Sequence, residues 1–351
     1  MTGDRTIAVQ TKEGDDISLS AEHVILATGS KPRELPGFPI DGDLIIGSDQ
    51  VLELTQLPAH AAIIGGGAIG CEFASMLTDL GTQVTILESA ERLIPGADPD
   101  IAKSLQRAFK KRGIRTITNA TLGGQTLLDT GVTVHLSDGT DIDVEKVIVS
   151  VGRTALSEGL GLENTTVEVD SEGCVVVDQY CRATASGVYA VGDLIATPQL
   201  AHVGFAEAML AVQNIRDEKA SSINYERTAW AIYCHPEVAY AGLTETQAHE
   251  AGLEIVVSKH RFIGNARAAI HGENEGMVKV IAERRIDGKA GRILGVHLIG
   301  PWVTEQLSQG YMAINWELEI DQISKFIQPH PTFSEVFGEA VLELAGRTLH
   351  G

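Results

Sequence analysis

A short glycine-rich turn limits the possible folds of this chain more than any other feature. Residues 65–70 are Gly-Gly-Gly-Ala-Ile-Gly, which fits the pattern G-x-G-x-x-G. An apolar run at 62–64 precedes the turn, and residues 69–80 follow it with Ile69, Phe73, Met76 and Leu80 on one face of an expected helix. A second apolar run at 84–87 ends in Glu88. This order predicts a parallel strand–helix–strand unit and an α/β fold.

Each glycine of the pattern has a physical reason to be there. Gly65 permits a tight turn, Gly67 lets the backbone approach a pyrophosphate, and Gly70 lets the helix pack closely on the strand. Ala68 and Ile69 open the helix, whose N-terminal amides and positive potential favour an anion. The turn is therefore predicted to bind a dinucleotide. A glycine turn that is only flexible would have the same sequence.

The acid at the end of the second strand indicates which dinucleotide is bound. Glu88 can accept hydrogen bonds from both ribose hydroxyls, and its charge would repel a 2′-phosphate. No arginine immediately follows it in 89–91. The sequence thus favours NAD over NADP, while the adenine half of FAD stays the alternative for the turn taken alone.

The charge balance bears on partners and location. The 351 residues contain 27 Lys and Arg against 47 Asp and Glu, a net charge of −20 that repels phosphate backbones and anionic lipids. Nucleic acid and membrane surfaces are therefore not expected as partners. Residues 1–16 are polar and charged, and no apolar run reaches the roughly 20 residues of a membrane-spanning helix. We expect a cytoplasmic protein.

The cysteines suggest neither a metal nor a disulfide. Cys71, Cys174, Cys181 and Cys234 form no C-x-x-C and no spacing that repeats with histidine. Free Cys is among the most buried residue types. We expect free, buried thiols without a redox role, and no metal site.

The segments outside the strand–helix–strand unit indicate further domains. Residues 7–10 and 17–19 predict a hairpin, and 23–27 predict a strand closed by the turn Thr28-Gly29-Ser30. Pro32, Pro36 and Pro39 mark a linker. Strand-like runs at 132–134 and 147–149 lead to Gly152-Arg153, where the inserted domain is expected to end. A buried strand at 187–191 ends in Gly192-Asp193.

The last third of the chain differs in character. A helix is expected from Gly204, and from about Tyr225 the pattern is α+β. Strands are expected at 255–257, 277–280 and 293–296, and helices after Val303 and after Thr332.

Taken together, these motifs resemble the pyridine nucleotide-disulfide oxidoreductases along nearly all of the chain. In that family an A-T-G-S turn, here 27–30, and a G-D strand end, here Gly192-Asp193, both lie against FAD, with the NAD domain inserted between them. The resemblance implies that Thr28, Gly29, Ser30 and Asp193 bind FAD, with Asp193 on the ribityl chain. It places Gln199, Leu200, Ala201 and His202 beside the flavin ring, and Glu72 and Gly152 in the NAD site.

The resemblance also implies the domain organisation and fold class. The fold is α/β, with two nested Rossmann-like nucleotide-binding domains, the first incomplete, and a C-terminal α+β dimerisation domain. Residues 1–48 would be the remnant of the first half of the FAD domain, and 49–153 the NAD domain. Residues 154–224 would return to the FAD domain, and 225–351 would form the interface domain.

Near the C-terminus, His330-Pro331-Thr332-Phe333-Ser334-Glu335 matches the family's H-P-T-x-S-E pattern. There the histidine is the acid–base catalyst and reaches the flavin of the other subunit, which implies a homodimer. A carboxylate on the second ring nitrogen fixes the tautomer and raises basicity, and Glu335 would supply it. Thr332 and Glu335 also fit a capping box that would simply start the last helix. His235-Pro236 has Tyr240 in place of the glutamate, so His235 is expected to be structural.

Within the family the resemblance is strongest to dihydrolipoamide dehydrogenases. It implies electron transfer from a dithiol through FAD to NAD⁺, with dihydrolipoamide or the lipoyl domain of a 2-oxoacid dehydrogenase complex as partner. The family's first G-x-G-x-x-G and its C-x-x-x-x-C disulfide do not occur before Ala27. We therefore expect a fragment or misassigned start, inactive alone in dithiol chemistry and poorly soluble; a truncated relative is the alternative. A soluble transhydrogenase or a non-catalytic NAD-binding remnant stays open as the function.

Overall fold

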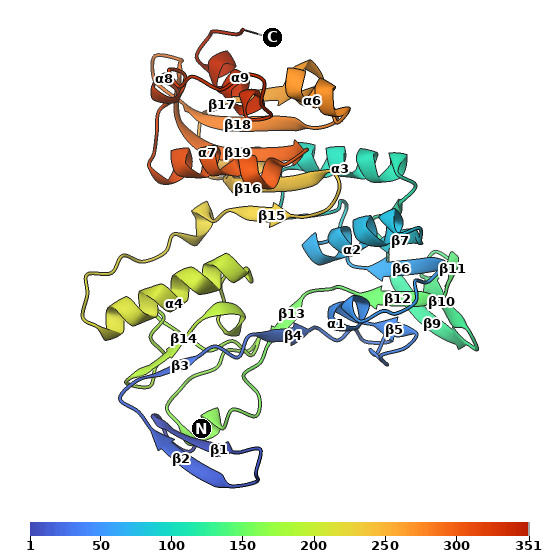
Figure 1. Ribbon diagram of the computed structural model, residues 1–351, viewed down its shortest axis with the longest axis vertical. Coiled ribbons are helices and arrows are strands. Elements are labelled where there is room, and N and C mark those ends of the chain that lie inside the picture. Colours follow the sequence, from blue (N-terminus) through green and yellow to red (C-terminus); the bar gives the residue numbers. More distant parts are fainter. Residues whose placement is uncertain (350–351) are drawn as a thin grey trace. The chain divides into compact units, whose positions relative to one another are not determined.

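The computed structural model describes residues 1–349 and divides the chain into two compact units (Figure 1). The first unit contains Met1–Arg33 and Gly152–Tyr225, and the second contains Glu34–Val151 and the described part of Glu226–Gly351. Each unit is therefore formed by two segments that are separate in the sequence, and the segments of the two units alternate along the chain. Within the described residues no helix is both long enough and apolar enough to cross a bilayer.

Small sheets make up the first unit. The predicted hairpin forms between β1 (Thr6–Gln10) and β2 (Asp16–Ser20), and β3 (Val24–Leu26) pairs in parallel with β14 (Val188–Ala190). Part of the segment predicted as a proline linker is a strand, β4 (Ser30–Pro32), which pairs with β13 (Arg153–Ala155). Pro32 is tolerated because β4 is an edge strand. Helix α4 (Ala201–Ile215) starts three residues before the predicted Gly204, and two single-turn helices are η1 (Leu162–Asn164) and η2 (Gly192–Leu194).

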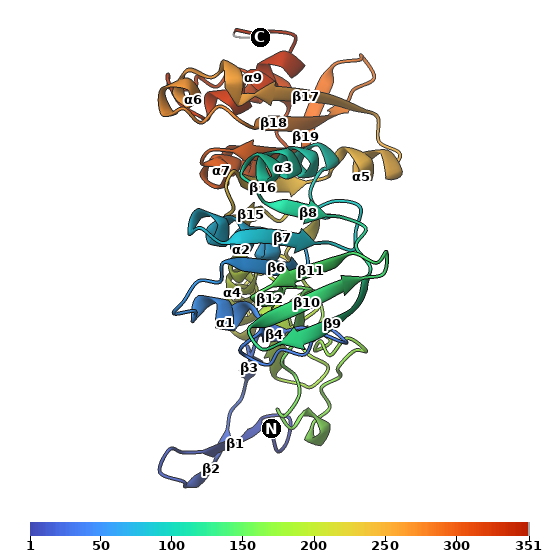
Figure 2. The ribbon, with the colours of Figure 1, turned by 90° about the vertical axis from the view of Figure 1, so that its right-hand side faces the viewer.

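The first part of the second unit is the expected parallel α/β layer. Its sheet has the spatial order β5 (Ile45–Ile46), β12 (Lys146–Val149), β6 (His60–Ile64), β7 (Gln83–Leu87) and β8 (Arg115–Ile117), all parallel. Its helices are α1 (Ser48–Leu52), α2 (Ala68–Asp79) and α3 (Pro99–Lys111). Figure 2 shows the antiparallel meander of β9 (Leu122–Leu128), β10 (Gly131–Leu136) and β11 (Asp141–Val144) beside this sheet.

The face of α2 that meets the core differs from the predicted one. Met76 is 37% exposed and Leu80 is 56% exposed, whereas Cys71, Ala74 and Leu77 are buried. Cys71, Ala74 and Leu77 are spaced three residues apart and share one face of the helix, so this face meets the core while Met76 and Leu80 extend toward solvent. In α3 the predicted core residues Ile101, Leu105 and Phe109 are all buried.

The second part of this unit is an antiparallel sheet with helices on it. Its strands run in the order β15 (Trp230–Ile232), β16 (Glu237–Gly242), β19 (Ala290–Gly300), β18 (Met277–Arg284) and β17 (Ile255–Arg261). Helix α7 (Val303–Asn315) packs on β16 and β19, and α9 (Glu335–Leu344) packs on β17 and β18. The shorter helices are α5 (Glu245–Glu250), α6 (Ala266–His271), α8 (Ile320–Ile323) and the single turns η3 (Tyr225–Arg227) and η4 (Phe262–Gly264).

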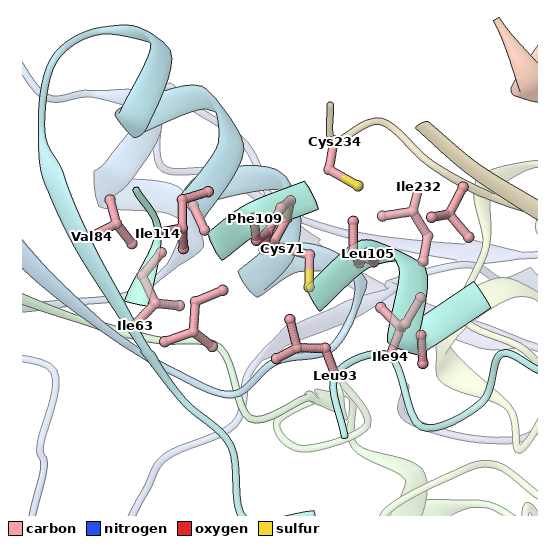
Figure 3. Close-up of a cluster of buried hydrophobic side chains, with 14 of the residues drawn as sticks. Ile63, Cys71, Val84, Leu93, Ile94, Leu105, Phe109, Ile114, Ile232 and Cys234 are labelled. Atoms are coloured by element: carbon pink, nitrogen blue, oxygen red, sulfur yellow. The ribbon is translucent and has the colours of Figure 1, made fainter. Parts of the chain in front are cut away.

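One hydrophobic core joins the two parts of the second unit. Figure 3 shows Ile63, Leu105 and Phe109 of the α/β layer in the same cluster as Ile232 and Cys234 of the C-terminal part. Parallel strands covered on both faces are continuous apolar runs, which is why β6 and β12 are buried along nearly their whole length. The two parts therefore pack as one body.

The cysteines only partly follow the expectation of buried thiols. All four are free, and Cys71, Cys181 and Cys234 are buried, but Cys174 is half-buried because it lies in a surface turn that closes on Asp170. Burial raises the pKa of the Cys71 thiol well above its ordinary value, and it raises the pKa of Cys234 to about 12. A thiol in that state is a poor nucleophile.

Candidate functional site

The glycine turn has the geometry that its sequence predicts. A Cβ on Gly70 would lie 1.9 Å from the carbonyl oxygen of Gly65, and one on Gly65 would lie 2.3 Å from the oxygen of Ser150. Both glycines are therefore required by packing. Gly67 precedes the first helical residues Ala68 and Ile69, and a Cβ there would meet nothing within 4 Å. The turn is closed on its protein side and open at the helix N-terminus, where a pyrophosphate fits.

Glu88 is directed at this turn. Its side chain is buried, with one oxygen accepting the Gly66 N–H at 2.6 Å and the other accepting the Ala90 N–H at 2.7 Å. A carboxylate oxygen accepts two hydrogen bonds. The oxygen bonded to Gly66 therefore keeps room for a ribose hydroxyl, whereas the oxygen bonded to Ala90 also accepts the Ser89 hydroxyl at 3.3 Å. The nearest arginine along the chain, Arg92, donates to Glu91 and to the Pro95 carbonyl. This arrangement fits the ribose of NAD better than a 2′-phosphate.

Glu72 lies one turn into α2. One of its carboxylate oxygens accepts the backbone N–H of Tyr233 at 2.8 Å, and burial raises its pKa. Gly152, also predicted for NAD, lies in the first unit at φ 108°.

The two segments predicted to bind flavin meet within the first unit. Because β3 and β14 are parallel with Val24 opposite Val188, the turns that follow them lie at the same edge. The Ser30 hydroxyl donates to the Asp193 carboxylate at 2.6 Å, and the Thr28 hydroxyl donates to the Leu156 carbonyl at 2.7 Å. The structure therefore brings the turn 28–30 and Asp193 to the same edge, with Ser30 in direct contact with Asp193.

Both of these turns face open space. Gly29 and Gly192 have φ of 72° and 70°, and a Cβ on either would meet nothing within 4 Å. Arg153 was not predicted as a site residue, yet it donates to the Ser30 hydroxyl at 2.6 Å and lies 3.7 Å from the Asp193 carboxylate. Its partners are distant in sequence, so no local pattern marks it.

The segment predicted beside the flavin ring leads into α4. Leu200 is its N-cap and is half-buried, while Gln199, Ala201 and His202 are exposed. Glu207, one turn further and fully buried, accepts the Gly192 N–H at 2.6 Å. The start of α4 is thereby fixed to the turn that carries Asp193.

The C-terminal motif forms the expected histidine–carboxylate pair. Nδ1 of His330 is 2.9 Å from one oxygen of Glu335, and the other oxygen accepts the Thr332 N–H at 2.8 Å. The imidazole is 63% exposed, whereas the carboxylate is 15% exposed. A fixed carboxylate behind an accessible ring is the arrangement that an acid–base histidine needs.

The capping box is only half formed. Glu335 accepts the Thr332 N–H, but the Thr332 hydroxyl donates to the Pro329 carbonyl, and the helix begins at Glu335 with Ser334 as its N-cap. Asn265 was not expected here. It donates to the Thr332 carbonyl at 2.9 Å and thereby holds the loop, and its only sequence signal is that of an ordinary N-cap.

His235 differs from His330 as expected. Its backbone N–H donates to the Ser75 hydroxyl and its carbonyl accepts from Arg112, while within residues 1–349 no carboxylate is bonded to its ring. Tyr240, at the place of Glu335, is buried and stacked between Trp230 and His297.

Two family models match nearly the whole chain. Residues 1–208 match the model described as pyridine nucleotide-disulphide oxidoreductase, and residues 228–341 match the dimerisation domain of the same family. The chain belongs to the pyridine nucleotide-disulphide oxidoreductases. The dimerisation domain supports a homodimer.

Among its relatives are dihydrolipoyl dehydrogenases. One from Bacillus subtilis is 38% identical over 98% of this chain and 73% of its own length, and dihydrolipoyl dehydrogenase 3 of Pseudomonas aeruginosa is 35% identical over 99% and 74%. Members of this group are oxidoreductases that use FAD and NAD, and the chain is an oxidoreductase of this kind.

Solved structures of two proteins have a fold similar to that of this chain. LpdA from Mycobacterium tuberculosis superimposes with a TM-score of 0.89 at 27% identity, over 96% of this chain and 72% of that one. The flavoprotein disulfide reductase RclA from Escherichia coli gives 0.89 at 26% identity, over 97% and 77%. The chain therefore spans 72% to 77% of the length of these four proteins.

Proposed function

We propose that this chain is the larger part of a dihydrolipoamide dehydrogenase that passes electrons from a dithiol to NAD⁺. The observation that carries the proposal is the His330–Glu335 pair, with an accessible ring and Nδ1 held at 2.9 Å by a carboxylate. His330 takes a proton from the dithiol and returns it in the reverse direction. Glu335 keeps the proton on Nδ1, so that Nε2 is the basic nitrogen.

The nucleotide residues have separate tasks. Gly67, Ala68 and Ile69 present amides to the NAD pyrophosphate, and Glu88 accepts the adenosine ribose hydroxyls. Gly65 and Gly70 permit the turn, and Glu72, one turn into α2, lies toward the nicotinamide carboxamide. Gly152 is assigned to NAD by the resemblance alone. NAD⁺ is preferred over NADP⁺ because Glu88 would repel a 2′-phosphate.

The flavin residues lie in the first unit. Thr28, Gly29, Ser30 and Asp193 hold the ribityl side, and the segment from Gln199 to His202 lies beside the ring. Bound FAD supplies the two-electron transfer between dithiol and nicotinamide. With this assignment the flavin domain comprises 1–48 and 154–224, the NAD domain 49–153 and the interface domain 225–351.

The dithiol step requires a cysteine pair that the 351 residues do not supply. No C-x-x-x-x-C occurs among Cys71, Cys174, Cys181 and Cys234, and three of these thiols are buried. We propose that dithiol activity needs the family's N-terminal segment, with its disulfide and its first glycine turn. The lipoyl domain of a 2-oxoacid dehydrogenase complex would then be the partner.

The test uses this chain joined to the N-terminal segment of the Bacillus subtilis relative. His330→Ala should lower dihydrolipoamide oxidation by about 10²- to 10⁴-fold, the usual contribution of a positioned acid–base group. His235→Ala is the matched control, because it is also followed by proline but has no carboxylate on its ring. Unchanged turnover in His330→Ala, or an equal loss in both variants, would refute the role of His330.

Two measurements, one on the unmodified chain and one on the joined protein, separate the rival functions. Flavin absorption bands in the purified protein would exclude a remnant that binds only NAD. Hydride transfer between NADH and NADP⁺ in the joined protein would favour a transhydrogenase, an outcome that the buried Glu88 carboxylate argues against.

A further inference from the structure

The loop between β7 and α3 forms one wall of the glycine turn. The Ile94 N–H donates to the Gly66 carbonyl at 2.7 Å. Leu93 is fully buried, and its Cδ2 would be 2.5 Å from a Cβ on Gly66. Glu88, at the start of this loop, accepts the Gly66 N–H. Residues 89–98 therefore support Gly66 through Leu93 and Ile94, and the Glu88 carboxylate through the Ala90 N–H.

This loop includes an unfavourable backbone conformation. Ile94 has φ 42°, in the left-handed region where a β-branched residue is a true outlier. Such a conformation persists only where the surroundings hold it in place. The Gly66 carbonyl accepts the Ile94 N–H, the Ala97 N–H donates to the Ile94 carbonyl at 2.9 Å, and the Ile94 side chain is buried in the core. Residues 95–98, between Ile94 and α3, thus contribute to holding this conformation.

The far end of the loop is fixed by a buried ion pair. Asp98, with no exposed surface, accepts Nζ of Lys279 on β18 at 2.8 and 2.9 Å through its two oxygens. Asp98 also caps α3 by accepting the Asp100 N–H at 3.0 Å. The lysine side chain thus connects the loop to the C-terminal sheet of the same unit.

Lys279 is the cation on which this arrangement depends. Its side chain is 1% exposed and also contacts Asp100 at 2.8 Å and Glu245 at 2.6 Å. Burial alone would lower its pKa, but its hydrogen bonds to these carboxylates raise it instead. Burial alone would raise the pKa of Asp98, but the Lys279 hydrogen bond and weaker contributions lower it. Removal of the lysine would leave Asp98 as a buried and uncompensated charge.

We propose that Lys279 is a positioning residue for the nucleotide: from the C-terminal sheet, it holds Asp98 and with it the strained loop that supports Gly66 and Glu88. The inference rests on the NAD site of the proposed function. Lys279 contributes through the loop and touches no substrate.

The test compares Lys279→Met with Lys259→Met in the 351-residue chain. Methionine keeps most of the volume and removes the charge. Lys259 contacts the same cluster, at 2.7 Å from Asp100, but is 45% exposed and does not touch Asp98. Calorimetry on folded protein measures the dissociation constants of NAD⁺ and of ADP-ribose. ADP-ribose contains the adenosine half of NAD⁺, which lies next to Gly66 and Glu88 in the proposed site.

In Lys279→Met both dissociation constants should rise about tenfold, because the strained loop relaxes. In Lys259→Met they should change by less than about twofold, as for an exposed ion pair. Hydrogen exchange should accelerate in 89–98 but not across β19. If Lys279→Met does not fold, Asp98→Asn removes the same ion pair and should give the same result.

The outcomes distinguish this proposal from the NAD site on which it depends. Failure of the unmodified chain to bind NAD⁺ and ADP-ribose would overturn the NAD site. Normal binding by the unmodified chain together with unchanged binding in Lys279→Met would overturn the positioning role alone. Exchange that accelerates equally in 89–98 and in β19 would also overturn it, since it would indicate a general loss of stability.

Discussion

At the scale of single residues, the glycines of the turn are required for two different reasons. Gly70 faces the backbone of Gly65, so a methyl group there has no room. Gly67 faces open space, so a methyl group there meets no protein atom. Sequence spacing alone assigns both to one motif, whereas the structure shows that packing requires the glycine at 70 but not the one at 67. This leaves ligand approach as the reason that we propose for Gly67.

Exchanging each of these glycines for alanine tests that separation. Gly70→Ala should lower the free energy of unfolding by about 3 kcal/mol, because overpacking against backbone cannot be relieved by a rotamer change. Gly67→Ala should lower it by no more than about 1 kcal/mol, the scale of an N-cap effect. It should nevertheless weaken NAD⁺ binding by about tenfold or more, because the added methyl lies where the pyrophosphate approaches.

Urea unfolding and calorimetric titration check the two effects. Similar losses of stability in both variants would contradict the assignment, as would full NAD⁺ affinity in Gly67→Ala.

Residues with local signals were predicted, and residues without them were not. Gly65, Gly70 and Glu88 follow from spacing along a strand–helix–strand unit, and His330 and Glu335 follow from a contiguous motif. Arg153 and Lys279 contact partners that lie more than 100 residues away. Such contacts arise from tertiary packing, which leaves no periodic trace in a single sequence.

At the scale of elements, what could be predicted depended on whether a segment carries its own apolar pattern rather than on its length. Helices α2 and α3 have a helical spacing of apolar residues, and strands β6 and β7 and the three-residue strands β3 and β14 lie in apolar runs. Strand β9 has seven residues but was not predicted, because two glycines and exposed side chains interrupt its pattern. Strand β5 has two residues, Ile45–Ile46, and exists because it pairs with Val147 and Ile148. Strand β4 likewise depends on Arg153–Ala155. These two strands are specified by their partners rather than by their own sequence.

The N-terminus of α3 should make stability depend on pH. Burial alone would raise the pKa of Asp100, but its hydrogen bonds to Lys259 and Lys279 lower it to about 2. An unfolded aspartate titrates near 3.9. A lowered folded pKa contributes stability that is fully present above the unfolded value and is lost as the pH falls toward the folded value. The window is therefore about pH 4 to pH 2.

Asp100→Asn should remove this contribution. Because the side chain is 36% exposed, screening reduces the effect, and we expect a loss of about 1 kcal/mol at pH 6. The difference between the variant and the unmodified chain should shrink as the pH falls from 4 to 2. Urea unfolding curves at intervals of half a pH unit measure it. A difference that stays constant down to pH 2 would contradict the assigned ion pairs.

At the scale of the whole molecule, the chain order explains why the fold class was predicted from sequence and the full arrangement was not. Alternating strand and helix signals indicate nucleotide-binding layers, and the change to α+β near Tyr225 indicates a third part. The division into two units depends on which segments share a core. Ile232 and Cys234 join the core that contains Ile63 and Leu105. No boundary signal in the sequence reveals that shared core.

The two units should also differ in stability. In the first unit β3 has one partner strand, and Ile25 at its centre is 39% exposed. Phe205 and Met209 of α4 in the same unit are 70% and 63% exposed. In the second unit β18 is paired on both sides, and Val278 and Val280 are fully buried. Sheets of two strands are marginal by themselves, so the first unit should open at a lower free energy.

Native-state hydrogen exchange followed by mass spectrometry measures this difference. With small amounts of denaturant, amides of Val188–Ala190 should exchange through partial opening, while those of Val278 and Val280 should exchange only through global unfolding. FAD added in excess should slow exchange around β3 and β14, because a ligand that binds only the folded form stabilises it. Equal protection in both units, or the reverse order, would show that the small sheets of the first unit are stabilised by interactions other than those described.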